Sequence, residues 1–218
     1  MNHLTLRSFV DADFEVFVQA YDETWGWEIS PEKSCPERRW TGEAYLAGNL
    51  LQSDGVRVSC VDGMPAGLLC ASFETGGLDP AVRRLACACW TTMQSAEEAL
   101  STTPLGRSLI VFMEELHQKN AAMIAGIEQS GRGDAGPELV YFITHPRHRG
   151  RGAGKVLLNA FEEECRSRKA SCAHLFTDDH CSWEGYLKSG WTKWAELPWS
   201  APLEEEAMTS FMLGRRFD

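Results

Sequence analysis

The 218-residue sequence has the composition of a globular protein, with 44% hydrophobic and 24% charged residues. Its 31 acidic and 21 basic residues give a formal net charge of -10, which repels the phosphate backbone of nucleic acids unless basic side chains cluster. No stretch approaches the roughly 20 consecutive apolar residues of a membrane span, and residues 1–7 lack the apolar segment of a signal peptide. We therefore expect one cytoplasmic domain over residues 1–218, without nucleic-acid or membrane partners.

The cysteines are numerous but show no paired C-x-x-C spacing, so free thiols in a reducing compartment are expected. Those that lie in apolar runs, and are expected to be buried as small hydrophobic side chains, are Cys60, Cys70, Cys87 and Cys89. A cysteine and histidine group close in sequence comprises Cys172, His174, His180 and Cys181. Its spacing matches none of the usual zinc patterns, and we expect no metal site.

The N-terminal part of the sequence predicts a strand, two helices and a hairpin. Asp11 is a helix-capping residue and is expected to start the first helix, which a tryptophan-rich loop over residues 25–36 ends. Asp62 and Gly63 are a strong signal for a hairpin turn. The other expected elements are a strand at 4–9, a helix at 37–51, and the hairpin strands at 56–61 and 66–73.

Residues 79–130 predict a pair of helices inserted between the third and fourth strands. Asp79 and Thr103 each stand before a proline, and a capping side chain followed by proline is typical of a helix start. Apolar residues recur at helical spacing after both positions. These two stripes are expected to pack into a core.

The C-terminal part alternates between strands and helices. A short apolar run over residues 139–143 is typical of a buried strand. The following helix carries Glu162, Glu163 and Glu164, which are expected on its exposed face. The expected bounds are 155–169 and 182–188 for the helices, and 172–176, 191–195 and 207–213 for the strands.

The segment from residue 138 to 158 joins a strand to a helix through a glycine-rich basic loop. Glycines let a ligand approach the main chain closely, and the amides at a helix start form a cradle for anionic oxygen. The cations of this loop are Arg147, Arg149, Arg151 and Lys155, with no acidic residue between them. In an acidic chain this local positive charge predicts a ligand that bears phosphate.

Two common phosphate-binding motifs do not fit this loop. A Walker loop would need glycine at position 149 and serine or threonine at position 156, where the sequence has Arg149 and Val156. A dinucleotide fingerprint that starts at Gly150 would need glycine or alanine where Lys155 stands. A mononucleotide or dinucleotide site is therefore disfavoured.

Residues 149–154 resemble the acyl-CoA loop of the GNAT superfamily of N-acyltransferases, which reads Arg or Gln, two residues, Gly, any residue, then Gly or Ala. Residues 179–191, from Asp179 to Trp191, are similar to a second segment of that family, Asn-x-x-Ala-x-x-x-Tyr-Glu-Lys-x-Gly-Phe. The departures are Asp179 in place of asparagine, Gly185 in place of an aromatic residue, and the helical insertion. The order of strand, loop, helix, strand and tyrosine also agrees with the family.

The resemblance implies an α/β fold: a mixed, mostly antiparallel central sheet flanked by helices, with a two-helix insertion at 79–130. It makes residues 138–195 the acyl-CoA-binding and catalytic half and acetyl-CoA the acyl donor. The positions that it implies for binding acetyl-CoA are Phe142, Ile143, Thr144, Arg149, Gly150, Arg151, Gly152, Ala153, Gly154, Lys155, Asp179 and Ser182.

The resemblance also implies two catalytic residues. Acyl transfer to an amine needs a base for the amine, donors for the oxyanion and a proton for the thiolate that leaves. Glu138 stands eleven residues before Arg149, where several family members carry a general base. Tyr186 occupies the position of the usual proton donor. A backbone amide near Phe142 is implied to polarise the acyl carbonyl.

The amine acceptor is left open by the sequence. The acidic chain favours a cationic small molecule, whereas a protein or peptide amine and a non-catalytic acyl-CoA-binding module are the alternatives. The resemblance leaves a homodimer open as well. Side chains with the chemistry to meet a cationic amine are the carboxylates Glu28, Glu32, Glu74, Glu114 and Glu115 and the indoles of Trp25 and Trp27.

Overall fold

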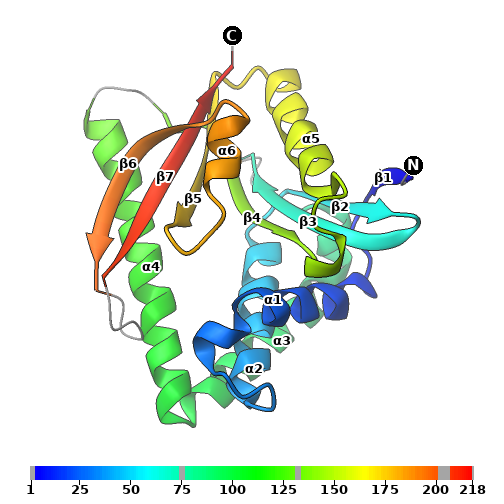
Figure 1. The fold of residues 1–218 in the computed structure, drawn as a ribbon, viewed down its shortest axis with the longest axis vertical. Helices are drawn as coiled ribbons and strands as arrows, with labels where there is room; N and C mark the ends of the chain where they lie inside the picture. Colours follow the sequence, from blue (N-terminus) through cyan, green and yellow to red (C-terminus); the bar gives the residue numbers. More distant parts are fainter. Residues whose placement is uncertain (1–2, 74–76, 131–133, 201–206, 218) are drawn as a thin grey trace.

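The computed structural model describes residues 3–73, 77–130, 134–200 and 207–217. Its strands form one seven-stranded sheet in the order β1-β2-β3-β4-β5-β7-β6, shown in Figure 1. The strands are β1 (Leu4–Arg7), β2 (Gly55–Val61), β3 (Met64–Ser72), β4 (Glu138–Thr144), β5 (Cys172–Asp178), β6 (Thr192–Trp199) and β7 (Met208–Arg216). The helices are α1 (Asp13–Ile29), α2 (Pro36–Leu51), α3 (Pro80–Ser101), α4 (Pro104–Gln129), the 3-10 helix η1 (Pro146–His148), α5 (Ala153–Ser167) and α6 (Glu184–Lys188).

All neighbouring strands of this sheet are antiparallel except β4 and β5, which run parallel. This mixed, mostly antiparallel sheet flanked by helices confirms the predicted fold class. The hairpin turn between β2 and β3 is confirmed as well, because Asp62 and Gly63 both have positive φ, at 52° and 82°.

The two faces of the sheet are covered by different helices. Alternate residues of β3 show this: Leu68 and Cys70 pack in one core cluster with α1, α2 and α3, whereas Leu69 and Ala71 pack in another with α5. Tyr141 of β4 belongs to the first cluster. The sheet therefore has an α1/α2 face and an α5 face.

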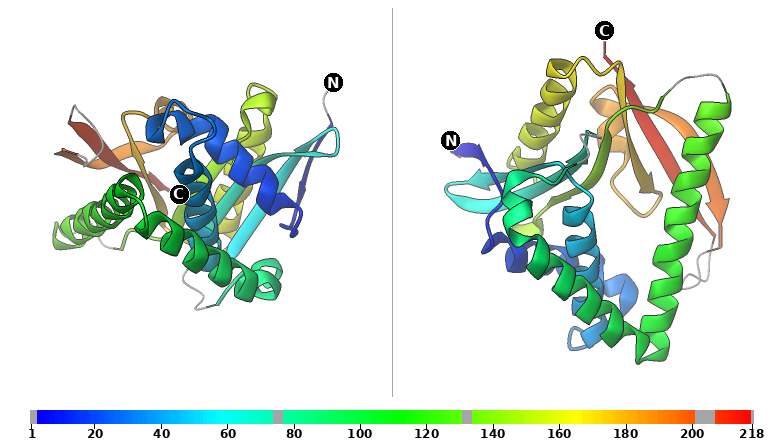
Figure 2. Two further views of the ribbon diagram at one scale, coloured as in Figure 1. Left: turned by 90° about the horizontal axis from the view of Figure 1, so that it is seen from below. Right: turned by 180° about the vertical axis from the view of Figure 1, so that it is seen from behind.

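The predicted two-helix insertion is present as α3 and α4. The carboxylate of Asp79 accepts a hydrogen bond from the amide of Ala81 at 2.8 Å, and the hydroxyl of Thr103 accepts one from the amide of Gly106 at 3.0 Å. α3 packs against α2, and α4 continues along β6 and β7. Figure 2 shows both helices on the side of the molecule turned away from the viewer in Figure 1.

Three local predictions in the N-terminal half of the chain were wrong. The first helix begins at Asp13, whose carboxylate accepts from the amide of Val10, rather than behind a cap at Asp11. It continues to Ile29, so the first part of the expected tryptophan-rich loop, with Trp25 and Trp27, is helical. Cys87 is exposed, whereas Cys60, Cys70 and Cys89 are buried as expected.

Strands β4 and β5 pair over a short distance and then separate. Their register joins Glu138 to His174 and Leu139 to Leu175 and goes no further in the described residues. On its other side, β4 has a bulge at Val140, because Tyr141 pairs with Cys70 while Leu139 pairs with Ala71. The bend separates the carboxyl ends of the two strands, as Figure 1 shows. The edge of β4 from Val140 to Thr144 is thus left without a strand partner toward β5.

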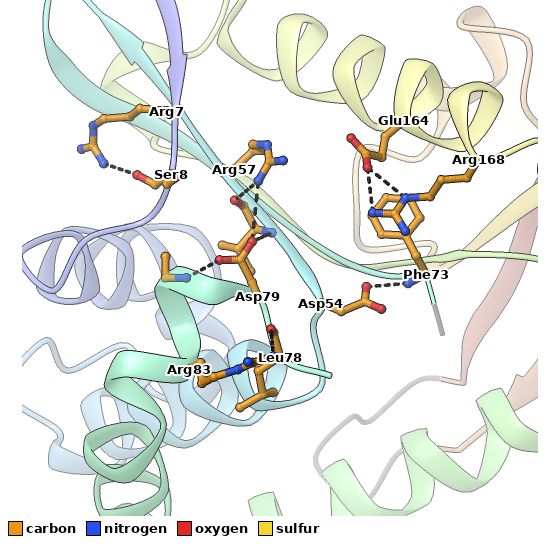
Figure 3. A network of polar contacts seen from close by, with 12 residues as sticks. Arg7, Ser8, Asp54, Arg57, Phe73, Leu78, Asp79, Arg83, Glu164 and Arg168 are labelled. Carbon is orange, nitrogen blue, oxygen red and sulfur yellow. Dashed lines mark hydrogen bonds and ion pairs between the residues drawn. The ribbon is translucent and has the colours of Figure 1, made fainter. Parts of the chain in front are cut away.

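Asp79 gives the first testable prediction, on stability. Its buried carboxylate accepts hydrogen bonds from the amides of Ala81 and Val56 and lies 3.6 Å from Arg57 (Figure 3). Asp79→Ala leaves two backbone donors without acceptors, so we expect the free energy of unfolding to fall by about 2–4 kcal/mol. Urea denaturation measures it. Asp79→Asn keeps an oxygen acceptor and should lose clearly less; equal losses would contradict the role assigned to the hydrogen bonds.

Candidate active site

The glycine-rich loop leads from η1 into the N-terminus of α5. Gly150 and Gly152 have φ values of 75° and 89°, a region that favours glycine. Gly152 is the N-cap of α5 and supplies no side-chain hydrogen bond, and the first bond within the helix runs from the amide of Val156 to the carbonyl of Gly152. The amides of Ala153, Gly154 and Lys155 therefore point out of the helix start, where an anion would satisfy them.

The cations of this loop are divided between two tasks. Arg147 pairs with Glu23 of α1 at 2.7 Å, and Arg149 donates to the hydroxyl of Thr24 at 2.9 Å and to the carbonyl of Thr144 at 3.3 Å. These contacts attach the loop to α1. Arg151 and Lys155 are exposed beside the helix start and add positive charge there. The predicted acetyl-CoA residues of the loop thus lie together around one open helix N-terminus.

The loop adjoins the opening between β4 and β5. A Cβ on Gly154 would lie 2.9 Å from the hydroxyl of Thr144 and 3.2 Å from the ring of Phe142, so glycine allows α5 to pack directly against β4. Phe142, Ile143 and Thr144 pair with β3 on one side and have no strand partner on the side toward β5. An extended chain that enters the opening could pair with the backbone groups that face this side.

Tyr186 lies beside the same opening on the α5 face. Its ring centroid is 6.1 Å from that of Phe142 and 6.1 Å from that of Trp191. Burial, and secondarily the negative charge of an ionised Cys181, raises the pKa of the Tyr186 phenol above its usual range. The phenol therefore holds its proton at neutral pH, as a proton donor must.

Asp179 and Ser182, the two other residues predicted to bind acetyl-CoA, make contacts within the segment after β5 and with β7. The carboxylate of Asp179 accepts from the amide of Thr209 at 3.1 Å, so it joins the end of β5 to β7. Ser182 is exposed, and its carbonyl accepts from the amide of Gly185 at the start of α6. Both residues hold the segment that carries Tyr186.

Glu138 begins β4 next to a buried histidine of β5. Its Oε2 lies 3.9 Å from Nε2 of His174, whose Nδ1 is 3.1 Å and 3.3 Å from the carbonyl oxygens of Gly136 and Ala135. Because two acceptors face Nδ1, the proton resides there and Nε2 carries a lone pair. Burial lowers the pKa of His174 and keeps the ring neutral. A proton between Glu138 and Nε2 would stabilise both groups.

An aromatic cluster on the α1/α2 face was not predicted. Tyr21 and Trp25 of α1, Tyr45 of α2 and Tyr141 of β4 have neighbouring ring centroids 5.3–6.5 Å apart. Trp25 was expected in a loop, and the tyrosines stood in helical and strand patterns that indicated only core positions. No local signal in the sequence joins these elements.

Asp178 ends β5 beside this aromatic cluster and was also missed. Burial raises the pKa of its carboxyl, although its Oδ1 accepts from the amide of His180 at 3.0 Å. The thiol of Cys181 hydrogen-bonds to the same carboxylate, and burial raises the pKa of that thiol to about 12. The indole of Trp25 in turn donates to the sulfur. The sequence held one signal for it: residues four apart in a strand share a face, so Asp178 lies on the same face of β5 as His174, the residue that pairs with Glu138.

The remaining acceptor candidates are scattered. Glu32 and Glu114 are exposed, Trp27 is 64% exposed, and Glu115 is half-buried on α4. Glu74 lies outside the described residues. In the part of the chain that the structure covers, no group of three or more His, Cys, Asp and Glu side chains is placed to hold a metal ion. No helix described there has the length and apolarity to cross a membrane.

Comparison with known proteins agrees with this geometry. The acetyltransferase (GNAT) family matches residues 79–191, more than half of the chain. Among solved structures, the polyamine N-acetyltransferase of Drosophila melanogaster, which forms N-acetylagmatine, superposes with a TM-score of 0.55 at 12% identity over 99% of this chain and 100% of that one. The PaiA N-acetyltransferase of Thermoplasma acidophilum, solved with coenzyme A, gives 0.54 at 11% identity over 99% of both chains.

A third similar structure is that of an enzyme named for a protein acceptor. The ribosomal-protein alanine N-acetyltransferase of Escherichia coli superposes with a TM-score of 0.54 at 10% identity, over 98% of this chain and 94% of that one. No curated protein matches the sequence. At these identities the structural likeness shows the fold, and the acceptor has to be argued from the residues of this chain.

Proposed function

The chain belongs to the acetyltransferase (GNAT) family, whose members use acetyl-CoA, and from this premise we propose that it acetylates a primary amine of a small molecule by direct attack. The observation that supports this most strongly is the open N-terminus of α5 beside the separated ends of β4 and β5. Acetyl-CoA, when bound, supplies an acetyl thioester. The proposal assigns its phosphates to the amides of residues 152–155 and its arm to the edge of β4.

Glu138 is proposed as the general base. It stands four positions before Phe142, which corresponds to about 13 Å along the strand. Because the carboxylate is this far from the position of the acyl carbonyl, the proton would travel from the amine to Glu138 through water. The lone pair on Nε2 of His174 supports this role, because it offers the proton a second acceptor next to the carboxylate. The amine loses its proton before nitrogen attacks the carbonyl carbon.

Tyr186 is proposed as the general acid. When the carbon–sulfur bond breaks, the thiolate of CoA takes a proton, and the buried phenol is a donor that is still protonated at neutral pH. The amide near Phe142 is proposed to stabilise the oxyanion. The products are an N-acetylated amine and CoA with a free thiol, and one proton is released to solvent.

A small acceptor is favoured over a protein because the side chains next to the opening are enclosed. Tyr141 is only 4% exposed, and Asp178 is half-buried and interacts with Cys181. Thiol release from acetyl-CoA, measured with amines, amino acids and peptides, tests the choice. Acetylation of peptides alone would overturn the small-molecule acceptor, and acetyl-CoA binding without turnover would favour a binding module.

Glu138→Gln carries the next prediction. Removing the carboxylate should lower kcat/KM near neutral pH by about 100-fold or more, with recovery at high pH as unprotonated amine becomes abundant. The pH profile of thiol release measures both effects. Glu163→Gln is the matched control, because it makes the same change at an exposed position on α5. A profile of the Glu138 variant that superposes on the parent would exclude Glu138 as the base.

A further inference from the structure

The aromatic cluster defined above, Tyr21, Trp25, Tyr45 and Tyr141, encloses phenol hydroxyls from three elements. Tyr21 and Tyr45 have ring centroids 5.6 Å apart, and Tyr45 meets Tyr141 edge to face at 5.6 Å. The hydroxyl of Tyr141 interacts electrostatically with those of Tyr45 and Tyr21, so the three phenols belong to one cluster. Such an arrangement combines ring faces, which attract cations, with oxygens that accept hydrogen bonds.

One hydroxyl in this cluster lacks a partner. The oxygen of Tyr141 is buried and makes no hydrogen bond within the described residues, although the side chain is 4% exposed. Buried hydroxyls are almost always hydrogen-bonded in native proteins. The hydroxyl is therefore available to a group that enters from outside the chain.

Carboxylates stand on two sides of the aromatic cluster. On the α1 side, Glu28 interacts electrostatically with the hydroxyl of Tyr21. On the sheet side, Asp178 and Glu138 interact with the hydroxyl of Tyr45. No lysine or arginine in the part of the chain that the structure covers forms an ion pair with Asp178, and a basic side chain that interacts with it electrostatically is His180. A half-buried carboxylate that no lysine or arginine neutralises gains from an ammonium ligand.

Asp178 also lies where the acceptor must react. Asp178 stands at the carboxyl end of β5, where β5 no longer pairs with β4. Cys181 interacts both with Asp178 and with the phenol of Tyr186, which borders the opening. Phe142, the position assigned to the acyl carbonyl, packs on the α5 face of the same opening. An ammonium on Asp178 would therefore approach the thioester from the face opposite α5.

We infer that the acceptor is an aliphatic diamine or polyamine, whose reacting ammonium binds Asp178 and whose second cation lies across the aromatic cluster toward Glu28. This rests on the proposed function and narrows its substrate class. Asp178 binds and positions the amine, while Glu138 takes its proton. The rings contact the methylene stem and the ammonium groups, and the hydroxyl of Tyr141 accepts a hydrogen bond from the ligand.

The test compares three acceptors with the same carbon stem: diaminobutane, butylamine and aminobutyrate. Each contains four carbons and a reacting amine at carbon 1 (carbon 4 of aminobutyrate). At the other end 1,4-diaminobutane carries an ammonium, butylamine ends in an uncharged methyl group, and 4-aminobutyrate ends in a carboxylate, so the charge at this end is positive, absent or negative. We expect kcat/KM for diaminobutane to exceed that for butylamine at least tenfold, and aminobutyrate to be the poorest. Calorimetry with the CoA-bound protein should show the same order of affinity for the acceptors.

Two variants test the two ends of the proposed acceptor site one at a time. Asp178→Asn keeps the oxygen that accepts from His180, so the fold is retained, and it should raise KM for both amines about tenfold or more while acetyl-CoA binding is unchanged. Glu28→Gln should lower kcat/KM for diaminobutane about tenfold or more and so remove its preference over butylamine. Glu163→Gln, on the opposite face of the sheet, controls for the loss of one negative charge and should change neither.

The outcomes distinguish this inference from the proposal on which it rests. If butylamine or aminobutyrate reacts as well as diaminobutane, or if Asp178→Asn leaves KM unchanged, the diamine site is overturned while amine acetylation stands. If the protein binds acetyl-CoA and acetylates none of the amines, the proposed function fails, and the acceptor site fails with it.

Discussion

Replacing Tyr186 with phenylalanine is expected to lower the turnover number about 100- to 10,000-fold, the range of general acid catalysis. The variant keeps the ring, and with it the contacts to Phe142 and Trp191 at centroid distances of 6.1 Å. Only the hydroxyl is lost, and it is needed when the thiolate leaves rather than when acetyl-CoA binds. Affinity for acetyl-CoA should therefore stay close to that of the parent, so kcat falls without a parallel change in binding.

Single-turnover rates with a saturating amine measure this effect, because product release does not contribute to them. A solvent deuterium isotope effect in the parent that is lost in Tyr186→Phe would locate the proton transfer at the phenol. The melting curve of the variant is recorded in parallel. An unchanged single-turnover rate would reduce Tyr186 to a packing residue of the α5-face core.

The basic glycine-rich loop and the helix start behind it were predictable because they lie in contiguous sequence. Gly150, Gly152 and the basic residues around them are neighbours in the chain, and the helix that follows fixes the direction of their amides. Local rules of glycine conformation and helix termini are sufficient there. The succession of strands and helices along the chain, with the two capped insertion helices, followed from equally local patterns.

The proposed acceptor side could not be predicted in the same way, because tertiary packing brings its residues together. Tyr21, Tyr45 and Tyr141 come from two helices and a strand, and their sequence positions carry no mark of their meeting. The role proposed for Asp178 depends on the bulge in β4, because β4 and β5 separate beyond it, toward the end of β5 where Asp178 lies. Hydrophobic periodicity predicts which face of a helix or strand is buried, but it does not predict which other element packs against that face.

Glu162 shows the same limit on a smaller scale. The run of glutamates on α5 indicated an exposed face, yet Glu162 is 6% exposed. It accepts a hydrogen bond from the indole of Trp191 at 3.1 Å and pairs with Arg215 at 2.8 Å. The partners lie on other elements, so a buried ionic contact between α5 and the C-terminal strands looked in sequence like a solvated residue.

Gly152→Val is expected to weaken acetyl-CoA binding about tenfold or more, since each charge-assisted hydrogen bond lost to a phosphate costs about 1.5–3 kcal/mol. Gly152 has a φ of 89° at the N-cap of α5, next to the open amides, and a Cβ there would lie 3.2 Å from Cδ1 of Leu4. Isothermal calorimetry measures the affinity.

Backbone strain is the competing explanation, because a branched residue at positive φ costs about 1–2 kcal/mol wherever it is placed. Gly63 supplies the matched control: its φ is 82°, and a Cβ there would meet nothing within 4 Å. Gly63→Val should therefore lower stability by a similar amount and leave the affinity for acetyl-CoA intact. If both variants lose affinity equally, strain and not the blocked helix start is responsible. If neither does, the phosphates bind elsewhere, and the loop between β4 and α5 loses the role that its open amides indicate.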